Sequence, residues 1–125
     1  MYHILIVAAG GAIGASARHL TNLAALRLLG PGFPWATLAV NVVGSLAMGV
    51  FVELLARRFG GSNELRLFVA TGILGGFTTF SSFSLDFAAL AGRGALLQAF
   101  LYVAVSVVLA IAALFLGMWL ARGLA

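Results

Sequence analysis

Ten consecutive residues combine groups suited to binding a small ion inside an otherwise apolar part of the chain. They read Gly75-Gly76-Phe77-Thr78-Thr79-Phe80-Ser81-Ser82-Phe83-Ser84. A buried hydroxyl without a hydrogen-bond partner costs about 2–7 kcal/mol in an apolar medium. A helix that only faces lipid therefore has no use for this composition. The run predicts a pore or a binding site for something small.

The phenylalanines of this run recur every third residue, at Phe77, Phe80 and Phe83. On a helix this spacing produces a stripe of rings that rotates slowly around the axis. A phenyl ring has a positive edge and a negative face, so ring edges can solvate an anion weakly. Neighbouring hydroxyl and amide donors, among them Thr79 and Ser81, can supply the rest. Weak binding suits conduction, because an ion must also leave its site.

Two other segments carry polar residues at helical spacing. Thr37, Asn41 and Ser45 are four residues apart and share one helix face, and Tyr102 and Ser106 form a similar pair. Such residues can simply hold membrane helices together, in contacts worth about 0.6–2 kcal/mol. The hydroxyl run elsewhere favours a different interpretation, in which these residues form a polar track.

The composition places these residues in a membrane. The chain has 125 residues, of which 63% are hydrophobic and 8% are charged, and its mean hydropathy is +1.17. A soluble domain has about a quarter charged residues. The basic residues are scattered, which excludes a nucleic-acid interface, and the absence of cysteine excludes thiol chemistry.

Four segments are long enough to position the polar groups across a bilayer, because each meets the requirement of roughly 20 mostly apolar residues. They cover about 4–29, 35–55, 65–90 and 96–120, and the Arg18-His19 pair interrupts the first. We expect residues 1–125 to form a single all-α, four-helix transmembrane domain. Ser62 or Asn63 could cap the third helix.

The glycines of the spans allow two interpretations. The Gly10-x-x-x-Gly14 and Gly72-x-x-x-Gly76 patterns are typical of close helix packing. Alternatively, the third helix is broken near its middle, so that freed backbone carbonyls point at a cation and half-helix N-termini at an anion. Serine and threonine can satisfy the loosened backbone, which makes a break tolerable.

Few ionisable residues lie in the spans. Arg18 lies well inside the first, where a charge costs about 2.5–3.5 kcal/mol. It snorkels, ends the helix early, or supplies positive potential at a vestibule. Asp86 is expected to pair with Arg93 or to cap a helix contact. Glu53 is expected to form a surface ion pair with Arg57.

The charges give almost no orientation signal. With four spans, one side holds Arg57, Arg58, Arg66 and Arg122, and the other holds Arg27 and Arg93, with Arg18 if it snorkels. This is a weak positive-inside bias. A single four-helix bundle has little interior for a pore. Insertion in both orientations would allow an antiparallel dimer with pores between subunits.

Three motifs resemble the Fluc (CrcB) fluoride channel family. They are residues 11–18, residues 37–45 and residues 75–84, and the resemblance covers essentially the whole chain. It implies a fluoride-selective channel in a bacterial plasma membrane, a dual-topology antiparallel homodimer with two pores, and one central structural sodium ion. Departures from the family's pattern are Ala36, His19, Ser82 and Ala110.

The resemblance also implies roles for individual residues. Gly75 and Thr78 match the residues whose backbone carbonyls hold sodium, and Arg18 matches the first-helix arginine. Fluoride-pore positions are Asn41, Phe80, Phe83, Thr79, Ser81, Thr37, Tyr102 and Ser106.

Two alternatives come from other classes of protein. A small dual-topology multidrug exporter needs a membrane-embedded carboxylate in its first helix, and this first helix has none. A non-transporting membrane assembly subunit would use the polar residues only as glue. An enzyme is not expected, since the chain has no Gly-x-Ser-x-Gly motif and no cluster of metal ligands.

Overall fold

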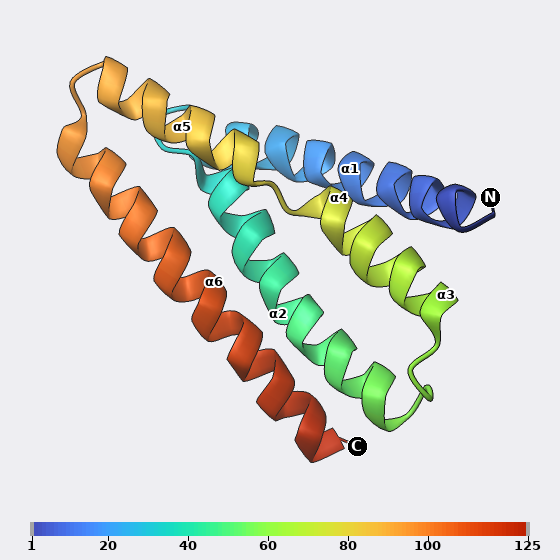
Figure 1. The fold of residues 1–125 in the computed structure, drawn as a ribbon. Helices are drawn as coiled ribbons and strands as arrows, with labels where there is room; N and C mark the ends of the chain where they lie inside the picture. Colours follow the sequence, from blue (N-terminus) through green and yellow to red (C-terminus); the bar gives the residue numbers. More distant parts are fainter. Residues whose placement is uncertain (1, 125) are drawn as a thin grey trace.

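The computed structural model describes residues 2–124, and this part of the chain is helical with short connections and no strand (Figure 1). This confirms the predicted all-α class. The elements are α1 (Tyr2–Leu29), α2 (Trp35–Arg57), α3 (Asn63–Arg66), the π-helical η1 (Leu67–Leu74), α4 (Gly75–Phe77), α5 (Phe80–Gly92) and α6 (Leu96–Leu124).

These elements make four helical segments with the length and hydropathy of membrane spans. They are α1, α2, the composite segment Asn63–Gly92 and α6. The four predicted spans are confirmed, with ends that differ by a few residues. The first helix does not end early at Arg18, which was one of the three alternatives for this residue, because α1 runs through Arg18 and His19 to Leu29. The third segment is broken, as expected, between α4 and α5.

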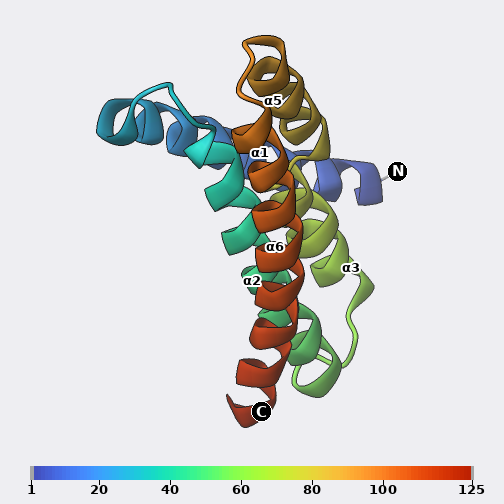
Figure 2. The ribbon, with the colours of Figure 1, turned by 90° about the vertical axis from the view of Figure 1, so that its left-hand side faces the viewer.

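Two layers of helices meet at the break. Helix α2 runs alongside α6, while α1 crosses the molecule next to η1 and α4 (Figures 1 and 2). Glycines allow the α2–α6 approach. A Cβ atom at Gly49 would lie 2.1 Å from the Leu114 carbonyl oxygen, and one at Gly117 would lie 2.3 Å from that of Leu46. Neither position therefore tolerates a side chain.

The contact of α1 with the third segment is equally tight. A Cβ at Gly10 would lie 2.9 Å from the Cα of Gly72, and one at Gly14 would lie 1.9 Å from the Ile73 carbonyl oxygen. A Cβ at Gly76 would meet the backbone of α1 at 2.8 Å. Both glycine patterns are thus packing faces, and the helix break exists as well.

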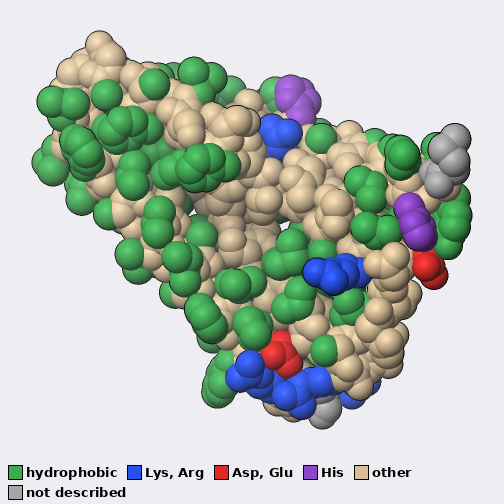
Figure 3. Space-filling view, in the orientation of Figure 1, with side chains coloured by type: hydrophobic (Ala, Val, Ile, Leu, Met, Phe, Trp, Pro, Cys, Tyr) green, Lys and Arg blue, Asp and Glu red, His purple; other side chains and the backbone are tan. Residues whose placement is uncertain are grey.

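Charged side chains gather at one end of the molecule, where α2 and α6 finish (Figure 3). Glu53 accepts from Arg57 at 2.8 Å, which confirms the expected pair, and from Arg122 at 3.0 Å. The Ser62 hydroxyl accepts from the backbone N–H of Leu65, which confirms the predicted cap of the third segment.

Much of the remaining surface is apolar. Large hydrophobic side chains such as Ile4, Leu28, Phe115 and Trp119 are exposed on the outer faces of α1 and α6. Lipid is the solvent that such faces suit. The buried cluster lies between α5 and α6 and consists of Phe83, Leu90, Ala99 and Tyr102.

Candidate functional site

The break in the third segment consists of two extended residues. Thr78 has φ −86° and ψ 159°, and Thr79 has φ −155° and ψ 125°. The N–H and the hydroxyl of Thr78 both donate to the Leu74 carbonyl, at 3.0 and 2.9 Å, and close the first half-helix. The Thr79 hydroxyl accepts from the N–H of Ser82 at 3.2 Å and caps α5.

Asn41 of α2 supports the extended backbone. Its Nδ2 donates to the Thr79 carbonyl at 3.0 Å, and its Oδ1 accepts from the Thr79 N–H at 2.8 Å. Non-helical backbone is tolerated at membrane depth only when side chains, protein or water satisfy its polar groups. One carboxamide therefore replaces both lost hydrogen bonds of Thr79, and leaves one Nδ2 hydrogen available for another acceptor.

Arg18 of α1 donates a hydrogen bond to a carbonyl of α4, on the N-terminal side of the break. Its Nε donates to the Gly76 carbonyl at 3.1 Å. The carbonyl end of a helix carries partial negative charge, so a cation there is favourable. Because the guanidinium finds this partner, α1 has no need to end at Arg18.

A cavity of about 340 Å³ opens beside the break between α2 and α6, and we call it the ring cavity. Asn41, Thr79, Phe80, Phe83 and Ser106 all line it. The Phe80 and Phe83 ring centroids are 5.6 Å apart, and Phe80 is 78% exposed although it lies at the middle of a span. The ring cavity therefore combines amide, hydroxyl and ring-edge groups without a carboxylate.

Ser106 is the notable donor in this cavity. The residue is 5% exposed, and its buried hydroxyl has no hydrogen-bond partner among residues 2–124. An unpaired buried hydroxyl costs free energy unless a ligand or a partner satisfies it. Ala110, one turn further along α6, also lines the cavity and supplies no donor.

A second cavity, of about 220 Å³, lies on the other side of the break, and we call it the arginine cavity. Arg18, Thr37, Ser82 and Asp86 line it, and Thr79 lines both cavities. The shared helix face of Thr37 and Asn41 is therefore divided between the two spaces. The extended backbone at Thr79 stands between them.

Tyr102 connects the two sides. The residue is fully buried, and its hydroxyl donates to Asp86 Oδ2 at 2.9 Å, on the side of the arginine cavity. Its ring centroid lies 5.1 Å from that of Phe83, which lines the ring cavity. Ser81 lines neither cavity, but its hydroxyl lies 3.4 Å from that of Thr79.

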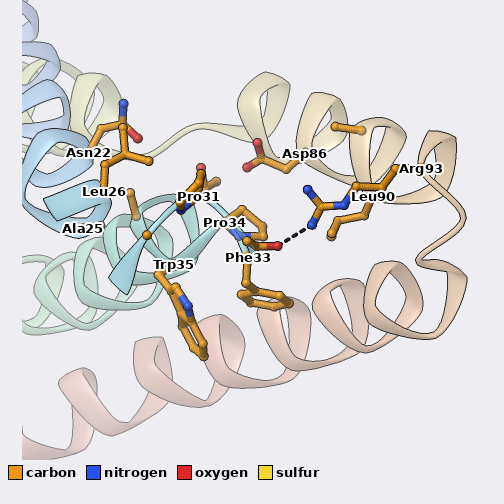
Figure 4. Close-up of a pocket in the computed structure, with 15 residues that line it drawn as sticks. Asn22, Ala25, Leu26, Pro31, Phe33, Pro34, Trp35, Asp86, Leu90 and Arg93 are labelled. Atoms are coloured by element: carbon orange, nitrogen blue, oxygen red, sulfur yellow. Dashed lines mark hydrogen bonds between the residues drawn. The ribbon is translucent and has the colours of Figure 1, made fainter. Parts of the chain in front are cut away.

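Of the two alternatives expected for Asp86, the contact between helices is found and the pairing with Arg93 is not. Arg93 donates to the Gly32 carbonyl in the α1–α2 connection, beside a third cavity of about 190 Å³ (Figure 4). Asp86 instead accepts from Tyr102, which lies sixteen residues further on, in α6. The sequence spacing of Asp86 and Arg93 suggested a local pair, and the contact with α6 was not visible in it.

Gly75 differs from its neighbours in the third segment. A Cβ there would meet only the Ala70 carbonyl oxygen, at 3.4 Å, an ordinary contact distance. Nothing within residues 2–124 therefore requires a glycine at this position. No cluster of three or more His, Cys, Asp or Glu side chains occurs in the described part of the chain.

Comparison with known proteins agrees with the resemblance seen in the sequence. A family model described as CrcB-like protein, Camphor Resistance (CrcB), matches residues 5–118. The chain belongs to the CrcB-like family. A protein of Mesorhizobium japonicum named fluoride-specific ion channel FluC is 67% identical over 124 residues, which cover 99% of each chain.

Two further CrcB-like relatives carry the same name. Those of a Chelativorans species and of Agrobacterium fabrum are 62% and 56% identical, each over 124 residues and 99% of both chains. CrcB-like relatives with this name are ion channels, a class of protein without enzymatic activity. Together with the four spans, membership of this family makes the chain a multi-pass bacterial membrane protein.

Proposed function

We propose that this protein is a fluoride channel that lets fluoride leave the bacterial cytoplasm passively. The observation that carries the proposal is the ring cavity, where Phe80, Phe83, Asn41 and Ser106 converge. Relatives of 56–67% identity are named fluoride-specific ion channels. Their names and the cavity's chemistry support the same ion.

The chemistry of the cavity suits a small, hard anion. Fluoride must exchange its hydration shell for convergent donors, and the cavity offers the unpartnered Ser106 hydroxyl and the second Nδ2 hydrogen of Asn41. Edges of the Phe80 and Phe83 rings add weak positive potential. A fixed lysine would hold the ion too long, whereas these groups let it leave.

The path proposed for fluoride passes the break. Arg18 lines the arginine cavity, where its charge concentrates anions at a vestibule. From there the path follows Thr37 and Thr79 to the ring cavity, with Ser81 beside Thr79 and the fully buried Tyr102 behind Phe83. The carboxylate of Asp86 accepts from Tyr102 and also lines the arginine cavity, where the positive charge of Arg18 opposes its repulsion of an anion.

An antiparallel homodimer inserted in both orientations completes this site. In one protomer the ring cavity is open on one side and Phe80 is exposed. Gly75 is also exposed, and no close contact within residues 2–124 requires a glycine there. A second copy that covers these residues would close two equivalent pores.

A structural sodium ion at the dimer axis fits the backbone at the break. Oxygen ligands suit hard cations, and the proposed ligands are the carbonyls of Gly75 and Thr78 from each copy. The exposed position of Gly75 permits close approach of the second backbone. Sodium would offset the convergent carbonyl dipoles at this interface.

Passive conduction is tested by fluoride efflux from liposomes that contain the purified protein. We expect release driven by the fluoride gradient alone, at a rate unaffected by a proton ionophore once potassium and valinomycin clamp the voltage. Efflux that requires an opposing proton gradient would indicate an exchanger and would contradict the proposal.

A further inference from the structure

Two side chains intercept backbone donors at the break. In an unbroken α-helix each N–H donates to the carbonyl four residues earlier. The N–H of Thr79 would therefore bond the Gly75 carbonyl, and that of Ser82 would bond the Thr78 carbonyl. Instead the Thr79 N–H donates to Asn41 Oδ1 at 2.8 Å, and the Ser82 N–H donates to Thr79 Oγ1 at 3.2 Å.

The two carbonyls whose helical donors are taken by side chains are those of Gly75 and Thr78. We propose that Asn41 and Thr79 are positioning residues of the sodium site, because each takes up the N–H that would otherwise compete with the cation. This inference rests on the proposed sodium site. The neighbouring Gly76 carbonyl differs from these two, because it accepts a hydrogen bond from Arg18 Nε at 3.1 Å.

Asn41 and Thr79 also belong to the proposed fluoride path. Both line the ring cavity, and the Asn41 Nδ2 bond to the Thr79 carbonyl fixes the two residues to each other. The same side chains therefore set the geometry of the cation ligands and part of the wall of the pore. Substituting them should change the response to sodium as well as fluoride flux.

The decisive variants are a matched pair at Thr79. Thr79→Val has nearly the same shape but no hydroxyl, so the Ser82 N–H becomes free to bond the Thr78 carbonyl. Thr79→Ser keeps the hydroxyl that accepts from Ser82. The measured quantity is the sodium concentration that gives half of the maximal dimer stability in detergent, followed by thermal dissociation.

We expect Thr79→Val to raise this sodium midpoint roughly tenfold or more, since the Thr78 carbonyl of each copy must give up a hydrogen bond to bind the cation. Thr79→Ser should restore a midpoint within about twofold of the unmodified protein. Thr21→Val makes the same change in α1, where the Thr21 hydroxyl donates only to the Ala17 carbonyl of its own helix, and should leave the midpoint unchanged.

Asn41→Ala gives an independent reading if Thr79→Val does not assemble. It frees the Thr79 N–H to bond Gly75 and should also raise the sodium midpoint. Unchanged midpoints in Thr79→Val and Asn41→Ala, with reduced fluoride flux, would overturn the positioning role and leave the pore role standing. If the stability of the unmodified dimer did not depend on the sodium concentration, the proposed sodium site itself would be wrong.

Discussion

The carboxamide of Asn41 bonds both backbone groups of Thr79, donating to its carbonyl at 3.0 Å and accepting from its N–H at 2.8 Å. A single side chain on α2 thus holds the extended backbone between α4 and α5. The same side chain lines the ring cavity. Structure at the break and the wall of the proposed pore therefore depend on one residue.

The first prediction concerns the role of Asn41 in the pore. Asn41→Asp keeps the oxygen that accepts from Thr79 but replaces the donor amide with an anionic carboxylate, which repels fluoride. We expect fluoride flux to fall by at least about tenfold, a change that corresponds to about 1.4 kcal/mol, while the protein still purifies as a dimer. A flux of at least half the rate of the unmodified protein would contradict a role for Asn41 in the pore.

The rings of the cavity are tested by Phe80→Ile and Phe83→Ile. Each change keeps apolar bulk and removes the ring quadrupole, so fluoride flux should fall strongly in liposome assays. Phe59→Ile is the matched control, because Phe59 lies exposed in the α2–α3 connection. Near-normal flux in both ring variants would mean that the phenylalanine stripe serves packing alone.

Gly75 and Gly72 should respond oppositely to an added methyl group. A Cβ at Gly72 would lie 2.9 Å from the Cα of Gly10, so Gly72→Ala should disrupt the fold of the single chain. Gly75→Ala has room within its own chain and should leave helix content intact while it weakens the dimer. Circular dichroism and size-exclusion chromatography distinguish the two. A stable Gly75→Ala dimer with an unchanged sodium response would argue against a cation site there.

Orientation can be measured with a single cysteine, since the chain contains none. Phe59→Cys places a thiol in the exposed α2–α3 connection. The weak arginine bias predicts that membrane-impermeant reagents label part of the population from outside intact cells and the rest only after lysis. Labelling confined to one of these conditions would contradict dual topology.

The sequence predicted the broad plan because composition and helix length constrain membrane proteins strongly. The four spans, the Ser62 cap and the break beside Thr78 follow from local residue types. The hydrogen-bond partners of Arg18 and Asp86, which are Gly76 and Tyr102, could not be predicted in this way, because each partner lies on another helix. Such contacts depend on how the helices cross, which spacing along one helix does not specify.

The division of the polar residues between two cavities was also beyond the sequence. Thr37 and Asn41 share a helix face, yet the backbone of Thr79 packs between the spaces that they line. That separation arises from the extended conformation of Thr78 and Thr79. The two hydrogen bonds between Asn41 and Thr79 could not be inferred either. A pore-lining role and a backbone-supporting role require the same residue type.

The most direct test is anion selectivity. Purified protein is reconstituted in liposomes loaded with equal concentrations of potassium fluoride and potassium chloride, and ion-selective electrodes follow both anions after valinomycin is added. We predict complete release of fluoride from protein-containing vesicles while chloride is retained. Equal release of the two anions, or retention of fluoride, would contradict the proposal that this protein is a fluoride channel.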